Sequence, residues 1–301
     1  MTRDAGRARR RGRAARATTT RRVRSGVIGL LVVVLGAAAV YLTFGRPAGE
    51  AGQAPWARLG TADVHSLAFV GGDPERLLFG HHGGLLESRD GGRSWSALPL
   101  ASDAMALGAA GDGSIVVAGH EVFRASADGG RTWTDLSTDL PSLDIHGFTR
   151  DPNDAARMWA YLAIGGLWES RDGGSTFVQA SEQNIVFPVA VRASAGTRLI
   201  GITAVGLAES LDGGRTWTAL ASPELFPMTA LAATDDGRTL VAGGVDALRR
   251  SDDGGSSWLA LAFTGTPLAI AVAAGGGAVA LVTDETEFFR SADGGTTWPG
   301  P

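Results

Sequence analysis

The chain of 301 residues has no cysteine, no lysine and only two tyrosines. The absence of cysteine excludes disulfide bonds and thiolate chemistry. The absence of lysine excludes a covalent mechanism through a lysine amine. All 27 basic residues are therefore arginine. Any stabilising crosslink or nucleophile must come from another residue type.

An eight-residue pattern, Ser-x-Asp-Gly-Gly-x-(Ser/Thr)-(Trp/Phe), occurs six times after residue 87. Its serines are 38, 44, 40, 41 and 40 residues apart along the chain. A period near forty residues with strand-like flanks is typical of four-stranded propeller blades. The sequence therefore predicts an all-β, six-bladed β-propeller. The repeats are Ser88–Trp95, Ser126–Trp133, Ser170–Phe177, Ser210–Trp217, Ser251–Trp258 and Ser291–Trp298.

Each repeat has the composition of a tight turn between two strands. The paired glycines can adopt positive φ, and the aspartate can accept hydrogen bonds from the turn itself. The aromatic residue that follows is large enough to fill the seam between neighbouring blades. We expect a structural role for the six aspartates, Asp90, Asp128, Asp172, Asp212, Asp253 and Asp293.

These repeats resemble the Asp-box, or BNR repeat, of sialidases, sortilin-type receptors and photosystem II assembly-factor propellers. The resemblance covers roughly residues 56–301, and it extends to bacterial exported Asp-box proteins that are labelled glycosyl hydrolases. It implies that the box joins the third and fourth strands of each blade, on the face away from the ligand pocket. The boxes are then scaffold, and function is expected on the opposite face.

The two ends of the repeat region indicate how the ring closes. Only Pro299, Gly300 and Pro301 follow the sixth repeat, so its fourth strand is missing. Ahead of the first blade, Trp56-Ala57-Arg58-Leu59 repeats the Trp-x-x-Leu pattern found after other boxes. We expect a strand at residues 56–60 to complete blade six of a domain spanning 56–301. Trp56 and Trp298 would then compete for one aromatic position.

The first 55 residues differ in composition from the repeats. Residues 1–25 form a basic tail, with ten arginines and one acid in residues 1–24. Residues 26–44 contain no charge, and as a helix they would reach about 28 Å, enough to span a membrane. We expect a single-pass anchor or uncleaved signal anchor with a cytoplasmic N-terminus, a linker at 45–55 and an extracytoplasmic propeller. A cleaved signal peptide is the alternative.

The net charge of the chain beyond the basic tail limits the binding partners that we expect. Beyond the tail, 17 arginines face 30 acidic residues, a net charge of −13. Such a domain should repel nucleic acid, so no nucleic-acid partner is expected. We expect contact with the membrane through the N-terminal helix, and binding of an extracytoplasmic protein, glycan or small ligand by the propeller.

The five histidines are expected on one face of the propeller, within blades one to three. Counting back from the boxes places His65 and His146 at the start of the first strand of their blades. It places His82, with His81 beside it, and His120 between the second and third strands of their blades. Other residues expected on this ligand-binding face are Glu121, Asp144 and Glu285.

Converging imidazoles are typical ligands of transition metals. His65, His82, His120 and His146 are therefore candidate ligands of copper or zinc. Thioethers at Met105 and Met228, expected at the same face, would favour copper. The alternative is that the histidines are ordinary hydrogen-bonding residues at strand ends, because no compact ligand spacing such as His-x-x-x-His is present.

An enzymatic function is a further alternative. Exo-sialidases use a tyrosine nucleophile, and Tyr41 lies in the apolar segment, so only Tyr161 is available. Tyr161 follows apolar residues of an expected second strand, which favours a packing role. A glycoside hydrolase using two carboxylates stays open, with Glu121, Asp144, Asp284 and Glu285 as candidates. The sequence thus leaves three hypotheses: a binding module, a metal-binding module and a glycoside hydrolase.

Overall fold

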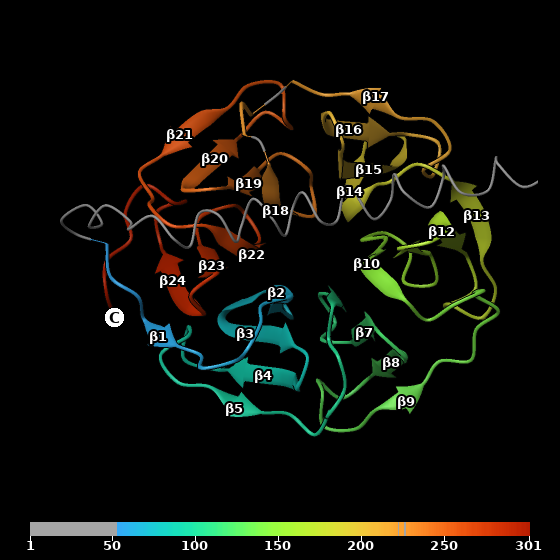
Figure 1. The fold of residues 1–301 in the computed structure, drawn as a ribbon, viewed down its shortest axis with the longest axis horizontal. Helices are drawn as coiled ribbons and strands as arrows, with labels where there is room; N and C mark the ends of the chain where they lie inside the picture. Colours follow the sequence, from blue (N-terminus) through green and yellow to red (C-terminus); the bar gives the residue numbers. More distant parts are fainter. Residues whose placement is uncertain (1–52, 222, 226) are drawn as a thin grey trace, which may run out of the picture. The chain divides into compact units, whose positions relative to one another are not determined.

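The computed structural model describes residues 53–221, 223–225 and 227–301. Within them, 24 strands form six antiparallel sheets of four strands each. Figure 1 shows these sheets arranged as blades around a centre, with β2 (Ser66–Val70), β10 (Ile145–Arg150) and β22 (Pro267–Val272) among the innermost strands. The predicted all-β, six-bladed propeller is confirmed.

The first three blades follow the chain from the inside outwards. Blade one contains β2, β3 (Asp73–His81), β4 (Gly84–Ser88) and β5 (Ser96–Ala97). Blade two contains β6 (Ala106–Ala109), β7 (Ile115–Gly119), β8 (Val122–Ser126) and β9 (Thr134–Asp135). Blade three contains β10, β11 (Met158–Leu162), β12 (Gly166–Ser170) and β13 (Val178–Ser181).

The last three blades complete the ring. Blade four contains β14 (Val186–Ala193), β15 (Gly196–Thr203), β16 (Gly206–Ser210) and β17 (Thr218–Ala219). Blade five contains β18 (Met228–Ala233), β19 (Leu240–Gly244), β20 (Ala247–Ser251) and β21 (Leu259–Leu261). Blade six contains β22, β23 (Val279–Thr283), β24 (Glu287–Ser291) and β1 (Ala57–Arg58).

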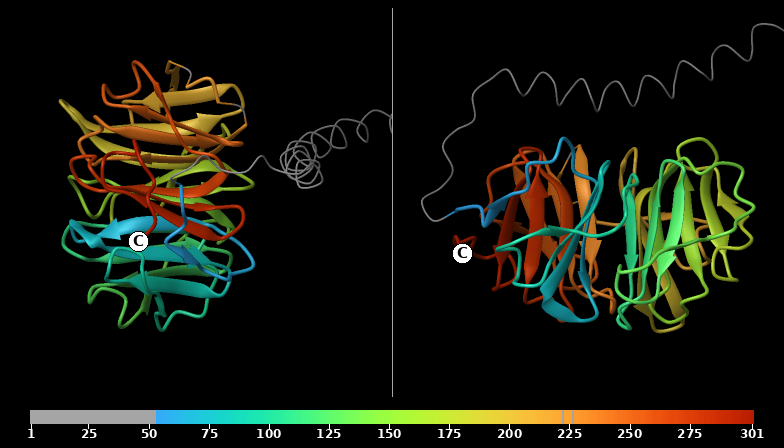
Figure 2. Two further views of the ribbon diagram at one scale, coloured as in Figure 1. Left: turned by 90° about the vertical axis from the view of Figure 1, so that its left-hand side faces the viewer. Right: turned by 90° about the horizontal axis from the view of Figure 1, so that it is seen from below.

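Burial follows the position of a strand within its blade. Every residue of the second strands β7, β11, β19 and β23 is buried, because blades pack on both faces of these strands. Both residues of the outermost strands β5, β9 and β17 are exposed. Figure 2 shows the blades edge-on, with strands running between the two faces of the propeller. The core is therefore a set of seams between blades rather than one central cluster.

Six hydrophobic clusters join residues of neighbouring blades, and one box aromatic packs in each of them. In the seam between blades two and three, for example, the rings of Phe123 and Phe148 are 5.8 Å apart. Burial of rings of this size contributes a few kcal/mol per seam, by an order-of-magnitude estimate. The box aromatics of the six seams are Trp95, Trp133, Phe177, Trp217, Trp258 and Trp298.

The repeated turn is stabilised mainly by its own serine and aspartate. In blade one, Ser88 Oγ donates to Asp90 Oδ1 (2.8 Å) and accepts from the Gly92 N–H (2.8 Å). The Ser94 hydroxyl and N–H both donate to the Asp90 carboxylate, at 2.5 and 2.9 Å. These bonds lower the pKa of Asp90 to about 2. Gly92, with φ of 101°, lies where a Cβ would overlap the Phe288 ring.

The same turns also fasten blades to one another. At five seams within the described residues, a side chain of one blade donates a hydrogen bond to the carbonyl of the first box glycine in the next blade. Such bonds hold the turn of one blade against the adjacent blade, on the face of the propeller that carries the boxes. The pairs are Arg76 with Gly129 (2.7 Å), Trp159 with Gly213 (3.1 Å), Arg198 with Gly254 (2.8 Å), Arg250 with Gly294 (3.1 Å) and Arg290 with Gly91 (3.2 Å).

The strand β1 pairs with β24, so the start of the propeller lies beside its end. The competition expected between Trp56 and Trp298 does not occur. Trp298 is 3% exposed and packs on Phe263, with ring centroids 5.0 Å apart, in the seam between blades five and six. Trp56 packs in the next seam, and its Nε1–H donates to the Pro299 carbonyl (2.8 Å).

The predicted basic tail (1–25), the predicted membrane helix (26–44) and most of the predicted linker (45–55) lie outside the described residues. Among the residues from 53 onward that the structure describes, no helix is long and apolar enough to cross a membrane.

Candidate functional site

Two positions of each blade meet at the face opposite the boxes. In an antiparallel blade, the start of the first strand and the turn from the second to the third strand lie at the same end of the sheet. The boxes, which join the third and fourth strands, lie at the other end. Residues before β2, β6 and β10 therefore share a face with the turns β3–β4 and β7–β8.

Four histidines and three aspartates converge on this face over blades one to three. We call them the His–Asp arc: His65, His82, His120, His146, Asp63, Asp103 and Asp144. They form three overlapping groups, and within each group one ligand atom per residue lies within 4.8 Å of the others. The four histidines predicted as metal ligands are thus brought into a continuous row.

The arc repeats from blade to blade. The His82 ring, in the β3–β4 turn, lies between Asp63 of its own blade and Asp103 of blade two. Its Nδ1 is 2.5 Å from Asp63 Oδ2, and its Nε2 is 3.7 Å from Asp103 Oδ2. In the same way, His120 Nδ1 is 2.6 Å from Asp103 Oδ2, and its Nε2 is 3.1 Å from Asp144 Oδ1 in blade three.

The tightest part of the arc is a triangle of three atoms from blades two and three. His120 Nε2 is 3.2 Å from His146 Nε2, and Asp144 Oδ1 is 3.1 Å from the first and 2.9 Å from the second. The isolated β-bridge between His120 and Asp144 fixes the backbone here. Two imidazole nitrogens and one carboxylate oxygen therefore lie within about hydrogen-bond distance of one another.

His65 and Asp103 are the most buried side chains of the arc, and each has an atom without a hydrogen-bond partner. The Asp103 side chain is 10% exposed; its Oδ1 has no hydrogen-bond partner, whereas its Oδ2 lies 2.6 Å from His120 Nδ1. The buried His65 Nε2 also has no hydrogen-bond partner, although it lies 3.5 Å from Asp103 Oδ1 and 3.6 Å from Asp63 Oδ1. A buried polar atom without a hydrogen bond is costly unless a nearby charge compensates it.

Burial and hydrogen bonding act differently on the histidines of blade one. Burial lowers the pKa of His65, outweighing the attraction of nearby Asp103. The hydrogen bond with Asp63 raises the pKa of His82. Burial alone would raise the pKa of Asp63, but the bonds from the His82 N–H and ring outweigh it and lower that pKa. Burial thus favours the neutral form of His65, which is the form that binds metals.

Three other residues predicted on the ligand-binding face lie outside the arc. His81 stacks on Phe79, with centroids 5.9 Å apart, and its Nδ1 accepts from the Gly83 N–H (3.1 Å). Glu121 is exposed in the β7–β8 turn, with φ of 57°. Glu285 is exposed in the β23–β24 turn of blade six.

The two methionines considered as copper ligands occupy different surroundings. Met105 lines the central channel, whereas Met228 packs against the hydrophobic cluster between blades four and five. The donor atoms that meet in the arc are nitrogen and oxygen. Such a set suits zinc and other divalent transition metals better than Cu(I), which prefers sulfur.

Sequence reasoning missed Asp63 and Asp103, although a signal for them was present. Asp63, Asp103 and Asp144 each stand two residues before the residue expected at the start of a first strand. The patterns Asp63-x-His65, Asp103-x-Met105 and Asp144-x-His146 repeat this spacing in three consecutive blades. Aligning the blades at this position would have predicted all three carboxylates.

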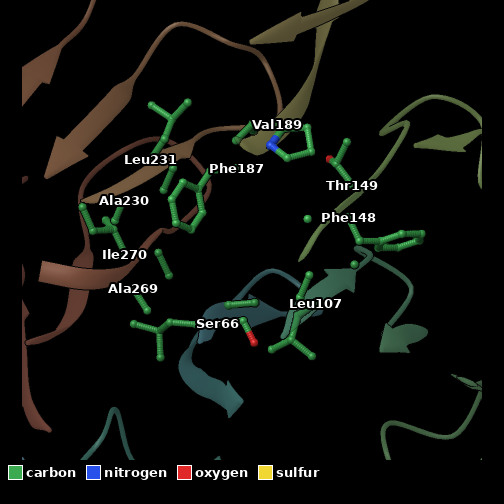
Figure 3. Close-up of a pocket in the computed structure, with 18 of the residues that line it drawn as sticks. Ser66, Leu107, Phe148, Thr149, Phe187, Val189, Ala230, Leu231, Ala269 and Ile270 are labelled. Atoms are coloured by element: carbon green, nitrogen blue, oxygen red, sulfur yellow. The ribbon is translucent and has the colours of Figure 1, made fainter. Parts of the chain in front are cut away.

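Below the arc, the inner strands of the six blades line a channel of about 250 Å³. Figure 3 shows the largely apolar side chains around this space, among them Leu107, Phe148, Phe187 and Ile270. His65 and His146 also line the channel. The arc therefore borders this channel.

The arc ends at blade three. In the turns that correspond to those of His82 and His120, blades three and four present Ile164 and Val205, whose exposed fractions are 84% and 92%. Tyr161 of β11, the residue that a sialidase mechanism would require, is buried, and its hydroxyl donates to Asn184 Oδ1 (2.7 Å). Its position agrees with the packing role that the sequence favours.

No protein-family model and no curated protein matches the sequence. Among solved structures, YCF48 from Cyanidioschyzon merolae is similar, with a TM-score of 0.51 and 20% identity over 82% of this chain and 87% of that one. The GH74 enzyme of Niastella koreensis gives 0.54 and 16%, over 78% and 46% of the two chains. A chain of the nidogen–laminin complex gives 0.60 and 12%, over 75% and 93%. At these identities the likeness shows the propeller fold alone.

Proposed function

We propose that this propeller is a metal-binding module that holds a divalent transition-metal ion, with zinc as the best-suited probe, at His120, His146 and Asp144. The observation that supports this most directly is the triangle of ligand atoms with edges of 2.9, 3.1 and 3.2 Å. The proposal narrows the ligand-binding module expected from the sequence to one chemical class of ligand.

The size of the triangle matches the coordination geometry of such an ion. Metal–ligand bonds of about 2.1 Å place neighbouring ligands about 3.0 Å apart on an octahedron and about 3.4 Å apart on a tetrahedron. The observed edges lie within or close to this range. Two histidines and one carboxylate on one face of an ion leave its other positions open. The site therefore has room for water or a small anionic ligand beside the ion.

Asp103 supports this assignment from outside the triangle. Its Oδ2 lies 2.6 Å from His120 Nδ1, which favours a proton on that nitrogen and leaves the Nε2 lone pair facing Asp144 and His146. A carboxylate behind a ligating histidine fixes the ring and makes it a better ligand. Asp103 is thus a positioning residue for the triangle.

The other hypotheses have less support. Asp144, one of the carboxylates considered for glycoside hydrolysis, is flanked by two imidazoles at 2.9 and 3.1 Å, an arrangement typical of metal ligation. Tyr161 is buried away from solvent. We therefore regard hydrolysis as the weaker alternative.

The proposal also covers the type of repeat in the module and its cellular location. The six turns are Asp-box repeats, supported by the shared serine–aspartate bonds such as Ser88 with Asp90. The propeller is tethered outside the cytoplasm, supported by ten N-terminal arginines followed by nineteen uncharged residues. An ion bound there would be taken from the extracytoplasmic medium.

Zinc retention by the purified full-length protein tests the proposal. The protein is loaded with Zn²⁺, dialysed, and analysed for metal content. We expect the wild-type chain to retain zinc and His146→Ala to retain less, because the triangle loses one of its three ligands. His81→Ala is the matched control, since His81 lies outside the arc. A wild-type protein without zinc, or a His146→Ala protein with the wild-type content, contradicts the proposal.

A further inference from the structure

We infer that the face opposite the boxes docks a basic, amphipathic segment of another protein, in which cationic and aliphatic side chains alternate. We call this surface the upper face. It consists of the segments that join the fourth strand of one blade to the first strand of the next, and the second strand of each blade to the third. These segments are 59–65, 82–83, 98–105, 120–121, 136–144, 163–165, 182–185, 204–205, 220–221 with 223–225 and 227, 245–246, 262–266 and 284–286.

The upper face carries acidic residues and no arginine. Its ten acids are Asp63, Asp103, Glu121, Asp139, Asp144, Glu182, Glu224, Asp246, Asp284 and Glu285, and the chain has no lysine. Arg124 of β8 contacts Ser102 of this face (3.4 Å), but it pairs with Asp135 of the outer strand β9 (2.5 Å). The connecting segments of the box face contain seven arginines and twelve acids, so charge is partly balanced there. The upper face therefore attracts a partner of positive charge.

Aliphatic side chains are exposed on the upper face in blades three to five. Ile164, Val205 and Val245 stand in the turn from the second to the third strand, and their exposed fractions are 84%, 92% and 38%. Equivalent turns of adjacent blades are neighbours around the ring, so these side chains form a row. A partner that covers the row removes its apolar surface from water, which favours binding.

The aliphatic row begins where the His–Asp arc ends. In blade three, the Ala163 N–H donates to the Asp144 carbonyl (3.4 Å), so the turn that carries Ile164 is bonded to a residue of the arc. Blade five combines both characters in one turn, where Asp246 follows Val245. A partner therefore meets aliphatic and acidic side chains side by side. Its complement is a segment that has both apolar and cationic side chains.

Phe187 adds an aromatic ring beside the row. It lies near the start of β14, where the pairing with β15 is irregular, and its φ is 49°. Figure 3 shows its ring beside the central channel, which it lines. Positive φ is unusual for a bulky residue, and such backbone strain is found most often at binding sites. We assign to Phe187 a contact with the apolar side of the partner.

Asp103 adds a negative atom beneath the same surface. Its side chain is nine-tenths buried, and its Oδ2 lies 2.6 Å from His120 Nδ1, whereas its Oδ1 has no hydrogen-bond partner. Water screens a buried charge less than an exposed one. Asp103 therefore strengthens the attraction of the upper face for cationic side chains.

Binding of defined peptides to the full-length protein in detergent tests the inference. The probe is a fluorescein-labelled peptide of alternating leucine and arginine, its binding is followed by fluorescence anisotropy, and protein-free micelles give the blank. We expect this peptide to bind, and a peptide of alternating serine and arginine to bind more weakly, because it cannot cover the aliphatic row. EDTA is present throughout, so a bound ion does not contribute and the result is independent of the proposed metal site.

Two pairs of variants separate the upper face from the rest of the surface. Val205→Ser should weaken binding about three- to tenfold, because the partner loses an aliphatic contact. Leu211→Ser, 68% exposed in the box of the same blade, should not change it. Glu121→Gln should weaken binding about two- to fivefold, because an exposed charge contributes little alone. Asp235→Asn, 67% exposed on the box face, is its control and should not change it.

Three results would overturn the inference. They are the absence of binding by the leucine–arginine peptide, equal affinity for the serine–arginine peptide, and equal effects of the upper-face variants and their box-face controls. Because Val205 is 92% exposed, its substitution does not disturb the packing of the propeller. Peptide binding with these differences in a protein that retains no zinc would support the inference and contradict the proposed function.

Discussion

Replacing Arg290 by methionine should destabilise the propeller at the seam where its two ends meet. Arg290 belongs to blade six, and its side chain is 8% exposed. Its Nη1 donates to the Gly91 carbonyl in blade one (3.2 Å), and its Nη2 donates to Glu75 Oε1 (2.6 Å). The guanidinium also lies 5.4 Å from the centre of the Trp56 ring. Methionine keeps most of the apolar stem and removes all three contacts.

The expected loss in the free energy of unfolding is the sum of the contributions of these contacts. A hydrogen bond from a charged donor contributes about 1.5–3 kcal/mol. The pair with Glu75 adds at most about 1 kcal/mol, because that side chain is 47% exposed and water screens the charge. The contact with Trp56 adds about 0.5–1 kcal/mol. Because such contributions are not fully additive, we expect Arg290→Met to lower the free energy of unfolding by about 2–4 kcal/mol.

Urea unfolding of the full-length protein, followed by tryptophan fluorescence, measures this loss. Arg58→Met is the control, because Arg58 of β1 pairs with Glu287 of β24 within blade six and is 71% exposed. An exposed pair contributes about 0–1 kcal/mol. A loss below about 1 kcal/mol for Arg290→Met, or equal losses in both variants, would refute the role assigned to the arginine contacts between blades.

Two further predictions concern the repeated turns. Gly92→Ala should lower the free energy of unfolding by about 2 kcal/mol more than Gly173→Ala. Both variants place alanine at positive φ, but only the new Cβ at position 92 would overlap a ring, that of Phe288. Equal losses in urea unfolding would contradict this prediction. The pKa of Asp90, lowered to about 2 by Ser94, predicts a stability contribution that is present above about pH 4 and lost as pH falls toward 2. Acid unfolding curves should show that Asp90→Asn is less stable than the wild type at pH 7 and that this difference shrinks toward pH 2.

The sequence predicted the fold well because each repeat is a complete local signal. The box from Ser88 to Trp95 specifies a turn by itself, and six boxes at even spacing leave few alternatives to a propeller. The positions of Trp56 and Trp298 could not be predicted, since the repeat pattern assigns both to the same aromatic position of blade six. Only packing against Phe263 in the folded ring separates them.

The sequence predicted which histidines lie near one another, but not which atoms of the site are in contact. Repeat position placed His65, His82 and His120 near one another, because equivalent positions of adjacent blades are neighbours in space. It did not reveal that Asp103 lies among all three, since a single aspartate has no periodic signal until the blades are aligned on it. Distances between ring nitrogens and carboxylate oxygens depend on side-chain rotamers, which no sequence pattern specifies.

Anomalous X-ray diffraction from zinc-soaked crystals of the full-length protein tests metal binding by the arc most directly. Data collected on both sides of the zinc absorption edge locate the ion without any assumption about its ligands. We predict an anomalous peak about 2.1 Å from His120 Nε2, His146 Nε2 and an oxygen of Asp144. Zinc peaks elsewhere on the protein, with none at these three residues, would contradict the account.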